Sequence, residues 1–248
     1  IAPRVTTLRT FDLGADKLPL ASGPRISGGA LGLRGLRLAL ARPELFDAAL
    51  RAMLRAAADA PIRIMFPMVT TVAELKLARQ RLTAARRALT KRGVAHGKVE
   101  VGAMIEVPSA ALMVDLIARE VDFLSVGTND LTQYALAVDR GDSRIAVFAD
   151  PLDPSIVRLL RMISDGADEA HVPASVCGDL AADPMAIPLL CGLGYRSLSM
   201  PATEIPMARE VLARLDVERA ERVAARALAA GTAGEVRAAI VDELAADL

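Results

Sequence analysis

The sequence predicts an α/β fold of the TIM-type (β/α)8 barrel, lacking its first one or two β/α units within these 248 residues. Strand-like and helical segments alternate, and repeated β-α units form a parallel sheet, either a barrel or a doubly wound sheet. Polar side chains stand at the carboxyl ends of successive strands, where barrel enzymes place their sites. No G-x-G-x-x-G turn marks a dinucleotide crevice. Only six strands can be counted, so either two strands lie upstream of Ile1 or the architecture is a different one.

The expected strands are short and rich in Val, Ile, Leu, Met and Phe. Most are apolar on both faces, as in a parallel sheet that is covered on both sides. They are RVTTLRTF (4–11), IRIMFPMV (62–69), VEVGAMIEV (99–107), FLSVGT (123–128), ASVCG (174–178) and RSLSM (196–200).

The segments between these strands have helical patterns. The clearest are 43–59 and 71–93, of which the second is amphipathic and ends at Gly93. Shorter helices are expected at 109–120, 154–170 and 183–194. The tail from about Glu204 reads as two or three helices with breaks near Leu215-Asp216 and at Gly231-Gly234. We therefore expect one barrel domain over residues 1–248 with helices at its C-terminus.

The composition limits the function classes. Thirty basic residues balance thirty acidic ones, so we expect no nucleic acid and no anionic membrane as a partner. No apolar run approaches the ~18 residues of a membrane span, and no signal peptide is visible, so no membrane insertion is expected. The two cysteines, Cys177 and Cys191, fit neither a disulfide framework nor a metal spacing. Their pattern favours a cytoplasmic location.

Two carboxylates close apolar strands. Glu106 lies at the carboxyl end of the third expected strand and Asp130 just after the fourth, so both side chains would reach the same rim. Two carboxylates without histidines suit Mg²⁺, which prefers oxygen ligands, keeps several waters and takes substrate oxygens. The alternative is a helix N-cap or an ion pair for each, and Asn129 with Asp130 could be a capping pair.

Three arginines are candidates for an anion site. Arg9 lies in a strand that we expect to be buried, Arg34 in the glycine-rich segment 27–35, and Arg140 ten residues after Asp130. A buried guanidinium needs planar oxygens from a carboxylate or a phosphate. For each arginine the alternative is a structural ion pair. The glycine-rich segment lacks the Walker lysine pattern and does not by itself specify a phosphate site.

A thiol completes the candidate set. Cys177 ends a strand and precedes Gly178 and Asp179, so its sulfur is a candidate to face the mouth of the barrel. The alternative is a buried small apolar side chain, the usual role of a free cysteine, which we expect for Cys191. The chain thus offers anion contacts, a metal site and a thiol, but no evident internal phosphate acceptor.

Five segments carry a family resemblance: LRTFDLGADK, RIMFPMV, VGAMIEVPSAA, EVDFLSVGTNDLTQYALAVDRGD and VCGDLAADPMAIPLLCGLGYRSLSM. Together they closely resemble the C-terminal phosphoenolpyruvate-binding barrel of Enzyme I of the bacterial phosphotransferase system, in order from about residue 6 to residue 209. The formal family name is phosphoenolpyruvate–protein phosphotransferase. GTNDLTQ is shared with pyruvate phosphate dikinases and phosphoenolpyruvate synthases, whereas YALAVDRG is similar to Enzyme I.

The resemblance implies an activity and partners. The activity is Mg²⁺-dependent transfer of the phosphoryl group of phosphoenolpyruvate to a histidine on a separate N-terminal domain, with release of pyruvate. This is the first step of the phosphotransferase system, which serves sugar transport or a nitrogen-related branch. The implied partners are that N-terminal domain of the same parent protein, the downstream phosphocarrier protein and a second copy of the barrel in a homodimer.

The resemblance also implies residue roles. Glu106 and Asp130 match the Mg²⁺ ligands, and Cys177 matches the cysteine that protonates the enolate as it becomes pyruvate. A free thiol has a pKa near ~8.5, so it is mostly protonated around neutral pH. Substrate contacts are implied for Arg9, Arg34, Asn129, Asp130 and Arg140.

The sequence departs from the family in four ways. Nothing matches the N-terminal domain, and an earlier barrel segment with a further phosphate-binding arginine is missing, so we expect a truncated chain that cannot complete the transfer alone. Ala15 replaces the second glycine of Gly-Gly-Asp-Lys, and Asp179 replaces a glutamate beside Cys177. The alternatives are a dikinase or synthase barrel, a non-catalytic phosphoenolpyruvate-binding or dimerisation module, and another carboxylate-Mg²⁺ barrel such as a lyase.

Overall fold

The structure, a computed structural model, describes residues 3–13 and 29–245. Its strands are β1 (Thr6–Arg9), β2 (Ile62–Phe66), β3 (Glu100–Ile105), β4 (Phe123–Gly127) and β5 (Ala174–Cys177). They follow chain order in the sheet, and β1 with β2, β2 with β3, and β4 with β5 pair in parallel. Consecutive parallel strands are the order of a β/α barrel, whereas a doubly wound sheet reverses its order at a switch point. The predicted fold class, a TIM-type barrel with units missing, is confirmed.

The prediction of a sixth strand at 196–200 is wrong, because this segment does not form a strand. Only one bridge forms, between Leu198 and Val176 of β5. The Val176 N–H donates to the Ser197 carbonyl oxygen at 3.0 Å, and the Ser199 N–H donates to the Val176 carbonyl oxygen at 2.8 Å. Gly178, which follows β5, has φ +94° and leaves the extended conformation, so the pairing does not continue past the end of β5.

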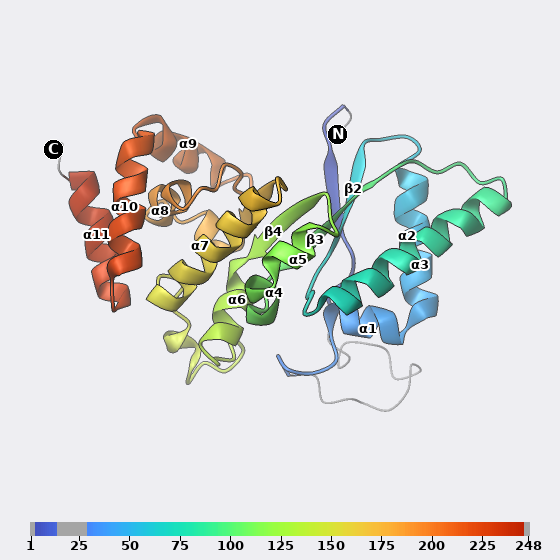
Figure 1. Ribbon diagram of the computed structural model, residues 1–248, viewed down its shortest axis with the longest axis horizontal. Helices are drawn as coiled ribbons and strands as arrows, with labels where there is room; N and C mark the ends of the chain where they lie inside the picture. Colours follow the sequence, from blue (N-terminus) through green and yellow to red (C-terminus); the bar gives the residue numbers. More distant parts are fainter. Residues whose placement is uncertain (1–2, 14–28, 246–248) are drawn as a thin grey trace. The chain divides into compact units, whose positions relative to one another are not determined.

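Two compact units make up the chain. The first contains the residues up to Met104 together with Leu116–Phe123, and the second contains Ile105–Asp115 and the residues from Leu124 onward. In the first unit, α1 (Gly35–Ala41), α2 (Pro43–Ala56) and α3 (Val72–Lys91) accompany β1 and β2 (Figure 1).

Aromatic packing and a capping box organise the first unit. The rings of Phe46 and Phe66 meet edge to face with centroids 6.0 Å apart, which fixes α2 against β2. At the start of α3, the Glu74 N–H donates to Thr71 Oγ1 at 3.2 Å and the Thr71 N–H donates to Glu74 Oε2 at 3.3 Å. These reciprocal bonds satisfy main-chain donors that the first turn leaves open, so the predicted helix 71–93 begins at residue 72.

The helix predicted at 109–120 is divided. α4 (Pro108–Leu112) ends at Met113, whose φ of −113° and ψ of 22° leave helical geometry, and α5 (Val114–Ala118) follows. The helix predicted at 183–194 forms as the single helix α8 (Ala186–Gly192), and a 3-10 helix that was not predicted, η4 (Asp179–Ala181), precedes it.

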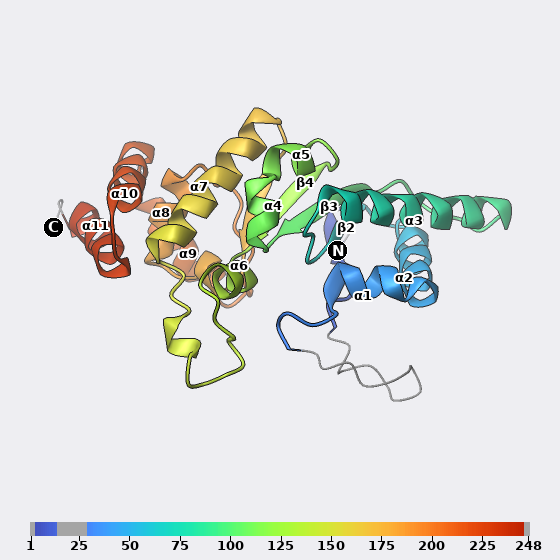
Figure 2. The same ribbon diagram turned by 60° about the horizontal axis from the view of Figure 1, so that its bottom comes forward.

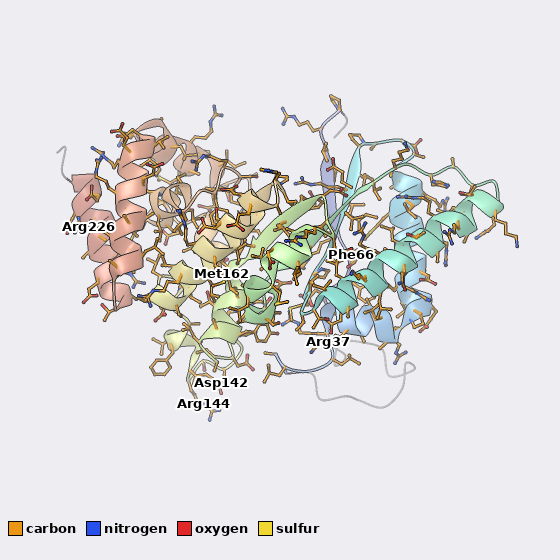
Figure 3. All side chains as sticks on the ribbon, in the orientation of Figure 1. Arg37, Phe66, Asp142, Arg144, Met162 and Arg226 are labelled. Carbon is orange, nitrogen blue, oxygen red and sulfur yellow. The ribbon has the colours of Figure 1, made fainter. Side chains whose placement is uncertain are left out.

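The second unit carries α6 (Thr128–Ala135) directly after β4, and α7 (Pro154–Glu169) before β5. The segment between α6 and α7, with the 3-10 helix η3 (Ala146–Phe148), projects from the helices of its own unit (Figure 2). Figure 3 shows Asp142 and Arg144 side by side on this segment, where they form an ion pair of 2.6 Å.

The tail forms three helices, α9 (Ile205–Ala213), α10 (Val217–Ala229) and α11 (Ala233–Ala245), with breaks at both predicted places. α10 and α11 lie side by side, and Arg226 of α10 pairs with Asp242 at 2.7 Å and with Glu243 at 3.2 Å (Figures 1 and 3). Among the helices of the described residues, we find none with both the length and the apolar character needed to span a bilayer.

Candidate active site

Asp12 joins two of the predicted arginines in the first unit. Arg34 donates to both of its carboxylate oxygens, from Nε to Oδ1 at 3.2 Å and from Nη2 to Oδ2 at 2.8 Å. Arg9 Nη1 lies 3.7 Å from the same Oδ2. The two-pronged geometry of Arg34 is also the geometry in which a guanidinium grips a phosphate. The structure therefore brings Arg9 and Arg34 together on one carboxylate.

Arg9 differs from its expected environment. The strand was predicted to be buried, yet β1 alternates between half-buried and exposed residues, and the Arg9 side chain is 46% exposed. The cause is the place of β1 at the end of the strand order, where β2 is its only neighbour among the described residues. A guanidinium in this position can be reached by a ligand.

Gly35 allows the main chain after Arg34 to pass close to Met68 and Asp12. Its φ is +53°, and an added Cβ would lie 2.5 Å from Met68 Cβ and 3.2 Å from Asp12 Oδ1. Met68 itself has φ +53°, an uncommon conformation for a non-glycine residue that the sequence did not signal. Residues 27–28 of the glycine-rich segment and the Gly-Ala-Asp-Lys departure at 14–17 lie outside the described residues.

Asp130 is the centre of the second set, in the second unit. It lies in the first turn of α6 and is buried. Its Oδ1 accepts hydrogen bonds from Gln133 Nε2 at 3.1 Å and from Arg140 Nη2 at 3.3 Å. Gln133 Oε1 in turn accepts from the Arg140 main-chain N–H at 3.0 Å. The Gln133 side chain therefore bridges Asp130 and Arg140 and closes the segment between them into a loop.

Sequence reasoning missed Gln133. The available signal was its spacing, because residues i and i+3 of a helix lie on the same face and Gln133 is three residues after Asp130. It also missed the pairing of Asn129 with Asp179. Asn129 Nδ2 donates to Asp179 Oδ2 at 3.1 Å, and the Asp179 N–H donates to Asn129 Oδ1 at 3.0 Å.

Cys177 is half-buried and lines a hollow of about 520 Å³. Its Sγ donates to the Val126 carbonyl oxygen at 3.3 Å and accepts from Ser125 Oγ at 3.5 Å. The hollow is also lined by Gly178, Asp179, Ala182, Asp183, Ser199, Met200, Pro201 and Glu204. The thiol thus stands beside open space and not in the apolar core.

The expectation that Cys191 is a buried core residue is wrong, because its side chain is half-buried. Arg196 Nη1 donates to its carbonyl oxygen at 2.7 Å, beside the C-terminus of α8. Burial raises the pKa of the Cys191 thiol, and the positive charge of Arg196 only partly opposes this shift. The thiol is therefore less reactive than an exposed cysteine.

Glu106 follows the carboxyl end of β3 and is 2% exposed. Two buried carboxylates, Glu106 and Asp130, provide the hard oxygen donors that Mg²⁺ prefers, so these residue types fit the ion. Within residues 3–13 and 29–245, no three His, Cys, Asp or Glu side chains are grouped so as to hold a metal. An ion held by the two carboxylates would take its other ligands from water and substrate, as Mg²⁺ commonly does.

Comparisons with known proteins agree with the motifs. Residues 1–217 match the family described as PEP-utilising enzyme, PEP-binding domain. The phosphoenolpyruvate-protein phosphotransferase of Geobacillus stearothermophilus is 43% identical over 231 residues, which are 92% of this chain and 40% of that protein. The Escherichia coli K12 protein named phosphoenolpyruvate-dependent phosphotransferase system is 44% identical over 237 residues, 93% of this chain and 31% of that protein. The chain therefore spans less than half the length of either relative.

A solved structure shares the fold. A citrate lyase from Burkholderia xenovorans LB400 superimposes with a TM-score of 0.51 over 81% of this chain and 68% of that one, at 20% identity. At this identity the likeness shows the fold alone. The family match and the two relatives confirm the resemblance that the motifs indicated.

Proposed function

Because the chain belongs to the PEP-utilising enzymes and carries their PEP-binding domain, we propose that it binds phosphoenolpyruvate for phosphoryl transfer to a histidine. That histidine is supplied by an N-terminal domain outside these 248 residues, and pyruvate is released. The downstream phosphocarrier protein then receives the phosphoryl group. The observation that carries the proposal is the family match over residues 1–217, and the relatives named phosphoenolpyruvate-protein phosphotransferase favour this reaction over a dikinase or synthase.

Glu106 and Asp130 would hold Mg²⁺, which when bound neutralises part of the charge on the transferring phosphoryl group. The support is their burial and their positions after the carboxyl ends of β3 and β4. A closed ring of hydrogen bonds through Gln133 keeps the Asp130 carboxylate in one orientation.

The arginines bind the phosphate in this proposal. Arg34 and Arg140 already donate to carboxylates, which shows that their guanidiniums are oriented towards planar oxygens. A phosphate oxygen can take the place of a carboxylate oxygen in such a contact. Arg9, whose guanidinium lies beside Asp12, has the same role. Asn129 contributes a further polar contact to the substrate.

Cys177 protonates the product. When the phosphorus–oxygen bond of phosphoenolpyruvate breaks, the electron pair stays on the enolate. The enolate then collapses to a ketone, its methylene carbon takes the Sγ proton to become the methyl group of pyruvate, and a thiolate remains. The thiolate regains its proton from solvent through the hollow that Cys177 lines.

A homodimer and a cytoplasmic location complete the proposal. The two free cysteines are consistent with a reducing compartment, where thiols persist.

Calorimetry tests the binding step. The 248-residue chain is titrated with phosphoenolpyruvate in the presence of MgCl2 and again with excess chelator. We expect saturable binding with MgCl2 and at least tenfold weaker binding without it. The Arg140→Met variant should lose at least tenfold in affinity, the typical size of a lost charge-assisted contact. The absence of any heat at millimolar phosphoenolpyruvate would contradict the proposal.

The transfer step is tested with the parent protein. Adding its purified N-terminal domain to the chain, Mg²⁺ and phosphoenolpyruvate should produce phosphohistidine and pyruvate in equal amounts. Pyruvate without phosphohistidine would indicate a lyase or phosphatase instead.

A further inference from the structure

Asp179 and Asn129 are hydrogen-bonded to each other, although they are fifty positions apart in the sequence. The Asn129 amide donates through Nδ2 to the Asp179 carboxylate and accepts through Oδ1 from the Asp179 main-chain N–H. A main-chain N–H can only donate, and an ionised carboxylate can only accept. Turning the amide over would set N–H against N–H and oxygen against oxygen. The Asn129 amide therefore has a single satisfied orientation.

Gly178 makes this approach possible. With φ +94°, it brings its main chain so close that an added Cβ would lie 2.5 Å from Thr128 Oγ1 and 2.8 Å from Asn129 Oδ1. Thr128 Oγ1 also donates to the Cys177 carbonyl oxygen at 2.9 Å. Residues 177–179 are therefore docked on the first turn of α6, and Asp179, which is hydrogen-bonded to Asn129, lines the same hollow as Cys177.

We infer that Asp179 is a positioning residue that holds Asn129 as a hydrogen-bond donor to an oxygen of phosphoenolpyruvate, an inference that rests on the proposed function. Fully ionised phosphoenolpyruvate presents only acceptor oxygens, so an amide binds it through N–H. Asp179 takes one of the two Nδ2 hydrogens, and the second has no acceptor among the described residues. Asp179 thus acts on the substrate through Asn129.

Three variants of the 248-residue chain test this role. Each is titrated with phosphoenolpyruvate and MgCl2, and its thermal unfolding is followed without ligand. Asp179→Ala removes the carboxylate but keeps the main-chain donor, so the amide is held by one bond only. We expect its Kd to rise at least about tenfold, the typical effect of one hydrogen bond to a charged group. Asp179→Glu keeps an acceptor and should stay within about threefold of wild type.

The third variant exchanges the two side chains, Asn129→Asp with Asp179→Asn. Both hydrogen bonds can then re-form, because the new carboxylate at position 129 accepts from the new amide and from the main-chain N–H at position 179. The unfolding temperature should return to within about 2 °C of wild type. The affinity should nevertheless fall at least about a hundredfold, because position 129 then offers no donor and carries a negative charge.

Asp165→Asn is the control, since it removes an exposed aspartate charge on α7 whose ion-pair partner among the described residues is Arg161, one turn earlier. Its Kd should not change. An Asp179→Ala variant that lowers the unfolding temperature with an unchanged Kd would overturn the inference and leave a purely structural contact. Wild-type affinity in the exchanged variant would overturn the donor role. A wild-type chain that binds no phosphoenolpyruvate would instead overturn the proposed function, and with it the identity of the acceptor.

Discussion

Asp130 shows how much of one carboxylate's environment comes from its own segment. Two of its hydrogen-bond donors, Gln133 and Arg140, follow it within ten residues, and Gln133 also binds the Arg140 main chain. The sequence singles out Asp130 and Arg140 as candidates, because one follows a strand and the other closes an apolar run. The bridging role of Gln133 was not, because it depends on where the chain turns after α6, at Ala137 with φ +55°.

Gln133 should therefore be needed for stability. Gln133→Leu keeps the size of the side chain but leaves the Arg140 N–H and the Asp130 carboxylate each with one partner fewer. We expect the free energy of unfolding to fall by about 1–3 kcal/mol in urea titrations at pH 7. The control Gln80→Leu, on an exposed face of α3, should change it by less than about 0.5 kcal/mol. Equal effects of the two variants would contradict the role of the bridge.

Cys177 gives a prediction for turnover. Cys177→Ser replaces the thiol with a much weaker acid of similar size, so protonation of the enolate should become slower. In the full-length parent protein we expect pyruvate release to fall at least about tenfold, while phosphoenolpyruvate affinity stays within about threefold. Pyruvate is measured with a coupled reductase, and Cys191→Ser is the matched control. Undiminished release from Cys177→Ser would show that another group protonates the enolate.

Pairings between residues far apart in the chain could not be predicted from the sequence. Asp12 with Arg34 and Asn129 with Asp179 join positions that are 22 and 50 residues apart. The sequence places Asp12, Asn129 and Asp179 near strand ends and Arg34 in a glycine-rich segment, but the pairing of these residues depends on side-chain directions that only the folded chain sets. The motif resemblance assigned roles to Arg34 and Asn129 without indicating these partners.

At the scale of elements, long segments were predicted better than short ones. The helix expected at 71–93 spans 72–91. Its apolar stripe indicates a helix over this segment, and its capping box sets the start at the same place. The segment 196–200 looked equally strand-like, yet it makes a single bridge, to Val176 of β5. The apolar composition of a segment does not by itself determine whether a neighbouring strand is available to pair with it.

α11 is tied to the segment before α7 by Arg237 and Asp150. Arg237 Nη1 and Nη2 donate to the two Asp150 oxygens at 2.8 and 2.9 Å. Burial alone would raise the pKa of the Asp150 carboxyl, but hydrogen bonds from Arg237 and from the Leu152 N–H outweigh it and lower the pKa below its ordinary value. A depressed folded-state pKa means that the pair stabilises the fold above pH ~4 and loses this effect as the pH falls through the folded-state value.

Asp150→Asn should accordingly destabilise the chain in a pH-dependent way. At pH 7 we expect a loss of about 0.5–1 kcal/mol, the upper range for a partly exposed ion pair. The difference from wild type should shrink as the pH falls below ~4 and vanish once the wild-type carboxyl is protonated. Urea titrations at several pH values measure it, and a difference that stays constant down to acid pH would contradict the ion-pair origin.

The contact of α8 with α10 depends on Gly192. An added Cβ would collide with the Ala220 carbonyl oxygen and lie 2.9 Å from Ala224 Cβ. Gly192→Ala should therefore force the helices apart and cost about 1–3 kcal/mol in chemical denaturation. Gly234→Ala, in the first turn of α11, would place its Cβ 3.9 Å from Thr232 Oγ1, an ordinary contact, and should instead stabilise by up to about 1 kcal/mol. A neutral Gly192→Ala would show that the two helices can separate without loss.

At the scale of the whole molecule, the fold class was predictable because a parallel sheet imposes an alternation that is visible in sequence. Five strands in chain order satisfy that prediction. The family followed from short motifs, of which GTNDLTQYALAVDRG was the most specific. The exposure of Arg9 was not predictable, because it depends on which strand stands at the end of the order among the described residues.

Asp12 has a consequence for how tightly any anion can be held. Its carboxylate already occupies the prongs of Arg34, with Arg9 close by. If phosphate binds Arg34 as we propose, it must displace this resident carboxylate, and the net gain in binding free energy is only the difference between two similar contacts. Binding by exchange of partners would therefore be readily reversed.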